Sequence, residues 1–321
     1  MMKRLFLIPL VAGMLVLFFS CETEKNIDEA VWTEVESPTT NWLLDIHFVD
    51  DVSGWAVGKN GTVLKTVNGE DWESVTISGI TDHSLYGVAF SDNEHGVLIG
   101  HGSDNQAIAY ATRNGGNTWT KVSLPATDFT PREIAFSNES QGWISGSNGI
   151  MLNTTDAGQT WHELQTPVGN TLYGLETVGD NKVYVCGSST LLYSSDGGDN
   201  WLNLIGEQDG YGWLQDVVFV NDDKGWIISA GGEGKVYHTT DGGNNWKLQL
   251  DSEGKYLNGI DVFTESKGWT VGESGMMFHT EDGENWTKVE SPTGYDLNAV
   301  FFTSETNGWA AGYKGTLLHF N

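Results

Sequence analysis

Six short polar turns are the features of the sequence that could most readily hold a metal ion or supply a catalytic acid. Each turn begins with serine or threonine and ends at tryptophan, and its central Asp or Asn is one of Asn68, Asn114, Asp156, Asp196, Asp241 and Asp282. Oxygen ligands of this kind suit Ca²⁺. However, an Asp or Asn side chain that accepts backbone hydrogen bonds also folds a turn, glycine supplies a positive φ, and tryptophan covers the hairpin. Because the turns recur along the chain, we predict that they are structural, with no metal ion and no cofactor.

Residues that could act as nucleophiles or bases do not form a recognisable catalytic motif. Cys186 follows the apolar residues 183–185 and has no adjacent histidine, so we expect it to be buried. The histidines include no HExxH motif, and His279 and His319 recur at one repeat position, which indicates strand packing. We therefore predict no catalytic residue and no enzymatic activity. A glycoside hydrolase with paired carboxylates remains the alternative, because acidic residues are plentiful.

The polar turns belong to a longer repeat of four short strands. A Gly-Trp pair opens a strand at Trp55, Trp143, Trp226, Trp269 and Trp309, and an alternating apolar segment precedes it. A Gly-Thr-x-Leu-x-Thr segment follows in several units, and the turn tryptophan begins the fourth strand. The period of about 40–47 residues is typical of four-stranded propeller blades.

The number of blades differs from the number of turns by one. The first-strand pattern occurs seven times, beginning at residues 43, 85, 131, 172, 214, 257 and 297, and the last unit stops after its third strand. Residues 31–38 match residues 285–292 almost residue for residue. We therefore predict an all-β fold, a seven-bladed β-propeller over residues 31–321, closed by the N-terminal strand. Such closure hides two strand edges that would otherwise invite aggregation.

The N-terminus has the pattern of a bacterial lipoprotein signal. Lys3 and Arg4 precede the apolar residues 5–19, and residues 17–21 resemble a lipobox ending at Cys21. We predict a signal peptide over residues 1–20, acylation of Cys21 and an acidic tether over residues 21–30. The protein would then be lipid-anchored to the outer membrane of the bacterial cell envelope, facing the periplasm or the cell surface. An ordinary cleaved signal with an incidental cysteine is the alternative.

The chain is strongly acidic, with 16 basic and 43 acidic residues and a formal net charge of −27. This charge repels nucleic acid and anionic membrane surfaces, so we expect no nucleic-acid partner and membrane contact through the lipid anchor only. Solubility of an exported protein is the first explanation of the charge, and attraction of cationic partners or divalent ions is the alternative. With Cys21 acylated, Cys186 is the one remaining cysteine, so no intramolecular disulfide can form.

The Gly-Trp-x-x-Gly strands together with the Thr-x-Asp-Gly-Gly-x-x-Trp turns resemble the bacterial-neuraminidase (Asp-box) repeat propellers of the photosystem II stability/assembly factor type. The resemblance covers residues 31–321. It implies a non-enzymatic factor that holds a membrane-protein precursor with the help of an arginine patch. Beyond residue 20 this chain has only Arg113 and Arg132, so we expect the scaffold to serve a partner outside photosynthesis.

Two enzyme classes share the repeat. Sialidases with this repeat use three arginines on the substrate carboxylate, and two arginines cannot form that triad. Xyloglucan hydrolases of this type use two facing propellers, whereas this chain has one. The resemblance therefore favours binding over hydrolysis, since fold alone does not fix function.

The candidate binding site follows from aligning the seven first strands. One equivalent position near the channel mouth is occupied by Leu44, Tyr86, Arg132, Tyr173, Gln215, Asn258 and Asn298, while Trp213, Tyr256 and Tyr295 lie beside the preceding loops. Aromatic rings, amides and an arginine suit recognition of a peptide or protein, or alternatively of a glycan. We predict a monomer whose binding residues are Tyr86, Arg132, Tyr173, Trp213, Gln215, Asn258 and Asn298. Packing between blades is the alternative role for several of them.

Overall fold

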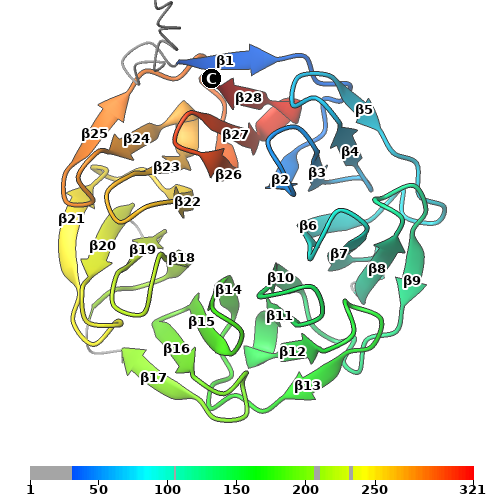
Figure 1. Cartoon of the computed structure of the whole chain (residues 1–321), viewed down its shortest axis with the longest axis horizontal. Helices are drawn as coiled ribbons and strands as arrows, with labels where there is room; N and C mark the ends of the chain where they lie inside the picture. Colours follow the sequence, from blue (N-terminus) through cyan, green and yellow to red (C-terminus); the bar gives the residue numbers. More distant parts are fainter. Residues whose placement is uncertain (1–30, 105, 206–209, 231–233) are drawn as a thin grey trace, which may run out of the picture. The chain divides into compact units, whose positions relative to one another are not determined.

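Seven antiparallel sheets of four strands each are formed by the residues that the structure describes. The structure is a computed structural model, and it describes residues 31–104, 106–205, 210–230 and 234–321. The sheets surround a common centre as the blades of a propeller, with the first strand of each sheet innermost (Figure 1). The predicted all-β, seven-bladed fold is therefore confirmed.

The first four blades follow one another in sequence order. Blade 1 contains β2 (Leu43–Phe48), β3 (Gly54–Gly58), β4 (Val63–Thr66) and β5 (Trp72–Ser74). Blade 2 contains β6 (Ser84–Phe90), β7 (His95–His101), β8 (Ala107–Arg113) and β9 (Thr120–Val122). Blade 3 contains β10 (Pro131–Phe136), β11 (Gly142–Gly146), β12 (Met151–Thr154) and β13 (His162–Leu164). Blade 4 contains β14 (Leu172–Val178), β15 (Lys182–Gly187), β16 (Thr190–Ser194) and β17 (Leu202–Ile205).

The remaining blades complete the ring. Short 3₁₀ turns join the second and third strands of blades 3, 6 and 7, at residues 147–149, 273–275 and 313–315. Blade 5 contains β18 (Leu214–Phe219), β19 (Gly225–Ser229), β20 (Lys235–Thr239) and β21 (Lys247–Asp251). Blade 6 contains β22 (Leu257–Val262), β23 (Gly268–Gly272), β24 (Met277–Thr280) and β25 (Trp286–Val289). Blade 7 contains β26 (Leu297–Ser304), β27 (Asn307–Gly312), β28 (Leu317–Phe320) and β1 (Trp32–Val35).

The outer strand of blade 7 comes from the other end of the chain. β1 pairs antiparallel with β28, with Trp32 opposite Phe320 and Val35 opposite Leu317. In Figure 1 the first strand lies beside the last. The indole of Trp32 is buried and contacts the rings of Trp269, Phe302 and Phe320 at centroid distances of 5.4, 5.7 and 5.4 Å. β1 is therefore the fourth strand of blade 7, as β25 is of blade 6, which explains why residues 31–38 match residues 285–292.

Stacked aromatic rings join neighbouring blades and explain the Gly-Trp signature. Trp55 of blade 1 stacks on Phe90 of blade 2, with 3.9 Å between ring centroids, and Trp309 of blade 7 stacks on Phe48 of blade 1 at 3.6 Å. On the third strand, His319 stacks on Trp309 at 4.7 Å, as His279 does on Trp269. The predicted packing role of the two histidines is confirmed.

The six polar turns are held by their own hydrogen bonds, as predicted. In the turn that follows β12, the Asp156 carboxylate accepts backbone N–H bonds from Gln159 and Thr160, each at 2.9 Å. Hydrogen bonds from the side-chain amide and then from the backbone N–H of Asn200 lower the pKa of Asp196 to about 2, and those of Asn285 do the same for Asp282. The tryptophans are less uniform than expected: Trp161 and Trp72 are buried, and the other four are half-buried.

Several predicted features of the N-terminus lie outside the described residues. The signal peptide (residues 1–20), the acylated Cys21 and the tether (residues 21–30) therefore remain predictions. None of the described residues forms a helix whose length and hydropathy would let it traverse a bilayer.

Candidate binding site

Each first strand carries a β-bulge, and the bulges define a ring of residues. In every blade one residue near the start of the first strand has no partner in the register of the second strand: Leu44, Tyr86, Arg132, Tyr173, Gln215, Asn258 or Asn298. A bulge releases a residue from the ladder and re-aims its side chain. These are the seven residues that the sequence alignment puts at one position, and we call them the mouth ring. All seven line a central channel of about 700 Å³.

Arg132 is the centre of a cation–π stack within the mouth ring. Its guanidinium carbon lies 5.2 Å from the ring centroid of Tyr86 and 5.4 Å from that of Tyr173. The Lys59 ammonium lies 4.8 Å from the same Tyr86 ring. Within the described ranges, no carboxylate oxygen lies within 4.0 Å of Lys59 or Arg132, whereas five other lysines have such a partner. Two cations are thus gathered around one tyrosine in an otherwise acidic protein.

The hydroxyl of Tyr86 fixes the hydrogen-bond pattern beside this stack. The Lys59 ammonium donates to that hydroxyl oxygen at 3.3 Å, and the hydroxyl lies 3.1 Å from His101 Nε2. His101 Nδ1 lies 2.9 Å from the carbonyl oxygen of Gly102, so in the neutral ring Nδ1 donates and Nε2 accepts from Tyr86. Tyr86 is therefore fixed in place by Lys59, which follows β3, and by His101 at the end of β7.

Two members of the mouth ring also join blades. The Asn258 amide donates to the carbonyl oxygen of Leu297 at 2.9 Å, and the Asn298 amide donates to that of Leu43 at 2.7 Å. Each bond connects the first strands of adjacent blades. The packing alternative therefore applies to these two residues.

Trp213 lies outside the channel, unlike the other predicted binding residues. Its side chain is 56% exposed, and its ring centroid lies 6.3 Å from that of Tyr173. Trp213 lines a second hollow beside the mouth, together with Tyr173, Gln215 and Asn258. The structure thus brings six of the predicted binding residues to the channel and leaves Trp213 on its rim.

Sequence reasoning missed the carboxyl groups of the channel wall. Of the described residues that line the channel, the acidic ones are Asp45, Glu133, Glu176, Asp216 and Asp261. Burial raises the pKa of Asp45, Asp216 and Asp261 to about 7 each and that of Glu176 to about 8. Burial, together with the charges of Asp45 and Asp216, raises the pKa of Glu133 well above its ordinary value. An available signal was the acidic residue directly after the mouth-ring position in blades 1, 3 and 5.

The channel aspartates form hydrogen bonds between blades. Asp45 accepts the backbone N–H of Ile46 at 2.7 Å and that of Val88, on the next blade, at 2.8 Å. Asp216 accepts the N–H of Ile260 on the next blade at 3.2 Å. Gly174 leaves the space that this arrangement needs, because a Cβ there would lie 2.9 Å from the Asp216 carboxylate. These carboxylates therefore stabilise the ring of blades.

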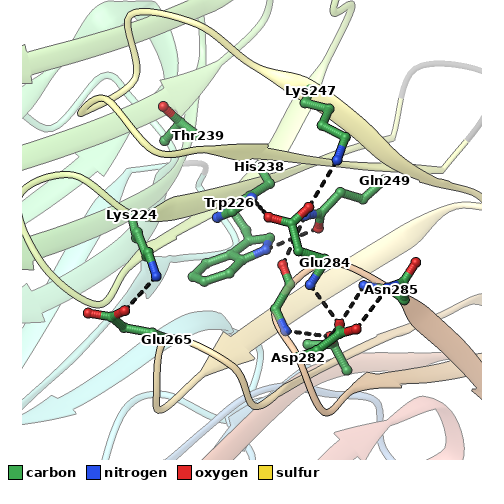
Figure 2. A network of polar contacts seen from close by, with 12 residues as sticks. Lys224, Trp226, His238, Thr239, Lys247, Gln249, Glu265, Asp282, Glu284 and Asn285 are labelled. Carbon is green, nitrogen blue, oxygen red and sulfur yellow. Dashed lines mark hydrogen bonds and ion pairs between the residues drawn. The ribbon is translucent and has the colours of Figure 1, made fainter.

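A further titratable cluster lies at the junction of blades 5 and 6 (Figure 2), and none of its residues lines the channel. The Lys247 ammonium forms an ion pair with one carboxylate oxygen of Glu284 at 3.0 Å, and the other oxygen lies 3.4 Å from Nδ1 of the buried His238. The His238 ring stacks on Trp226, and burial lowers the pKa of this histidine. Gln249 accepts the indole N–H groups of Trp226 and Trp286, one from each blade. We therefore regard this cluster as a structural junction.

The described residues include no group of three or more His, Cys, Asp or Glu side chains arranged to hold a metal ion. Cys186 is buried, as predicted, and burial raises the pKa of its thiol.

A family model described as "Photosynthesis system II assembly factor YCF48" matches residues 69–174 and 212–293, more than half of the chain. The chain belongs to this family. The YCF48 family is described as an assembly factor and not as an enzyme, which agrees with the predicted family resemblance and with the predicted lack of enzymatic activity.

Individual YCF48 relatives match along most of the chain. The Photosystem II assembly protein Ycf48 of Thermosynechococcus vestitus is 27% identical over 86% of this chain and 93% of its own length. The Photosystem II assembly lipoprotein Ycf48 of Synechococcus sp. (strain CC9902) is 28% identical over 67% of this chain and 64% of its own. A solved structure described as "YCF48 bound to D1 peptide" is 25% identical, covers 90% of this chain and 96% of its own, and has a TM-score of 0.75.

Proposed function

We propose that this chain is a non-enzymatic, envelope-anchored propeller that binds a segment of another protein at the mouth ring and assists the assembly of that protein. The observation that carries the proposal is the Arg132 guanidinium held between Tyr86 and Tyr173 at the channel. Rigid aromatic rings around an arginine provide a large contact area at a small entropic cost. The peptide-bound state of a similar solved structure supports a peptide ligand.

The bound segment should present an anionic group to Lys59 and Arg132. Both cations have hydrogen-bond donors to spare, and a guanidinium can bind a carboxylate through two parallel hydrogen bonds. A carboxylate near Arg132 would meet positive charge before it reaches the acidic channel wall. We therefore propose a peptide segment with an acidic residue, carried by an envelope protein outside photosynthesis and bound by a monomer.

Removing either tyrosine of the stack should weaken binding and leave the fold intact. We expect Tyr86→Ala and Tyr173→Ala each to cost about 1–2 kcal/mol of binding free energy, roughly a 5- to 30-fold increase in Kd. The probe is a set of peptides enriched from a phage-displayed random dodecapeptide library on the wild-type chain, and the measurement is calorimetric titration of each variant.

The matched control is His162→Ala, because His162 is exposed on the outer strand β13. It should leave Kd and the melting temperature unchanged. Unchanged affinity in both tyrosine variants would place the binding face elsewhere. Robust hydrolysis on a panel of envelope glycans, abolished by Glu176→Gln, would favour a glycoside hydrolase instead.

Membrane attachment should depend on Cys21. With Cys21→Ser we expect an unprocessed protein without fatty acid, since the thiol is the acylated group in lipoproteins. Mass spectrometry of the protein from wild-type and Cys21→Ser cells measures both changes, and Cys186→Ser is the control that keeps the acyl chain. A Cys21→Ser protein that is still cleaved and acylated would contradict the anchor.

A further inference from the structure

A second hollow of about 660 Å³ lies beside the channel, across blades 4 to 6. We call it the mouth groove; it is lined chiefly by Tyr173, Trp213, Gln215, Tyr256 and Asn258. Three of these residues also belong to the mouth ring, so the groove continues directly from the channel. None of the described residues that line it has a charged side chain, although the chain has a formal net charge of −27. A charged group entering the groove would lose hydration without gaining an ion pair.

The fold does not require the two exposed rings of the groove. Trp213 and Tyr256 are the residues directly before the first strands of blades 5 and 6, β18 and β22. The carbonyl oxygen of Trp213 accepts the backbone N–H of Ala230 at 2.8 Å, and that of Tyr256 accepts the backbone N–H of Glu273 at 3.0 Å. Thr130 and Thr171 make the same bond in blades 3 and 4 with small polar side chains. The backbone role is therefore independent of the side chain. Even so, blades 5 and 6 place side chains there that are 56% and 41% exposed.

The backbones that carry the two rings are held rigidly. Trp213 also forms a β-bridge with Ser188, so bonds to blades 4 and 5 fix it from both sides. The Tyr256 N–H donates to the Glu273 carboxylate at 3.1 Å. At Gly272 a Cβ would lie 2.1 Å from the Tyr256 carbonyl oxygen, so glycine permits this close approach. Pre-organised rings lose little freedom when a ligand packs on them.

Gln215 supplies the polar contact that such a groove needs. Its amide has no hydrogen-bond partner within the described ranges, and it lies between the channel and the two rings. A primary amide both donates and accepts, so it can pair with the backbone of an extended peptide. Aromatic-lined grooves with such groups bind extended proline-rich segments, whose conformation is already formed in solution.

We propose that the mouth groove binds an uncharged stretch of the partner peptide, rich in proline and aliphatic residues and in extended conformation, next to the acidic residue held at Arg132. This inference rests on the proposed peptide-binding function. It specifies the ligand further: one chain segment combines an anionic residue for the mouth ring with an apolar stretch for the groove. Charge favours this occupant, because the described residues of the groove are uncharged in a protein that is acidic as a whole.

The test is selection of phage-displayed random dodecapeptides on the full chain, followed by calorimetric titration of the enriched peptides. Wild-type protein should enrich peptides in which a proline- or aliphatic-rich stretch adjoins an acidic residue. Trp213→Ala and Tyr256→Ala should each raise Kd at least 10-fold. A peptide whose apolar stretch is replaced by Gly-Ser residues should bind the wild-type protein with a Kd raised by a similar factor. The same replacement should change the Kd for Trp213→Ala very little. The control is Trp42→Ala, which changes the equivalent residue of blade 1, 47% exposed and outside the groove.

The outcomes separate the inference from the function on which it rests. If the peptides lose affinity for Tyr86→Ala but bind Trp213→Ala and Tyr256→Ala with unchanged Kd, the proposed role of the groove is wrong and peptide binding at the mouth ring is still supported. Failure to enrich any peptide would overturn the proposed function and the groove with it. Binding of a neutral glycan that depends on Trp213, without peptide binding, would identify the groove as a carbohydrate site and contradict the proposal.

Discussion

Trp32→Ala should lower the free energy of unfolding by about 3–5 kcal/mol, a large share of the roughly 5–15 kcal/mol typical of a folded domain. The indole of Trp32 is buried against Trp269 of blade 6 and against Phe302 and Phe320 of blade 7. Its removal leaves a cavity at the junction where the ring closes. We expect the melting temperature to fall by roughly 5–15 °C, measured by calorimetry.

Trp213→Ala is the matched control, because it removes an indole that is exposed, and its melting temperature should remain close to that of the wild type. Deleting residues 22–38 should have a larger effect and expose the edge of β28 to aggregation. A synthetic peptide of residues 31–38 should then restore solubility when it is added. An unchanged melting temperature in the deletion variant would show that β1 does not stabilise the ring.

Stability should fall as the pH rises from 6.5 to 8.0. The channel carboxyl groups have raised pKa values in the folded protein, about 7 for Asp45, Asp216 and Asp261, against about 4 in an unfolded chain. The folded state therefore binds more protons, and the stability present at low pH is lost as the pH passes through the folded pKa. Because the channel is open to water, we expect a loss of about 1 kcal/mol for each group.

Between pH 6.5 and 8.0 the effect of the channel carboxyl groups on stability can be distinguished from that of the buried histidines. Burial lowers the pKa of His47 to about 4, so His47 contributes stability that is lost only as the pH falls below 6.5. The triple variant Asp45→Asn, Asp216→Asn, Asp261→Asn should reduce the dependence between pH 6.5 and 8.0, measured by urea denaturation. The dependence that remains should come from Glu176, whose pKa burial raises to about 8. Glu163→Gln, on the exposed surface of β13, should keep the wild-type slope. A stability that rises over this range in the wild type would contradict buried protonated carboxyl groups.

Much of the fold could be predicted because each repeat signature has a local physical cause. The Asp156 turn forms from hydrogen bonds within a few residues, and Trp55 must be buried because it stacks on the next blade. The match between residues 31–38 and 285–292 revealed the pairing of β1 with β28, since equivalent strands need equivalent side chains. The repeated turns, the Gly-Trp pairs and the matching strands can therefore be recognised in one sequence without an alignment of relatives.

The site could be predicted only in part, because its properties depend on several blades at once. Alignment put Tyr86, Arg132 and Tyr173 at one position, but the stack of Arg132 between two tyrosines arises from three adjacent blades. Asp45 appears as an ordinary strand residue until its bond to Val88 on the next blade is seen. Likewise, the exposure of Trp213 depends on its place beside the channel.

Site-specific photo-crosslinking in the cells that produce the protein tests the central claim most directly. A photoreactive phenylalanine derivative in place of Tyr173 should yield a discrete adduct with another protein, identified by mass spectrometry. The same probe in place of His162, on the outer strand β13, should yield none. Arg132→Gln should abolish the Tyr173 adduct without lowering the amount of protein. Equal adducts from both positions, or none from Tyr173 in a fully folded protein, would contradict a protein-binding site at the mouth of the channel.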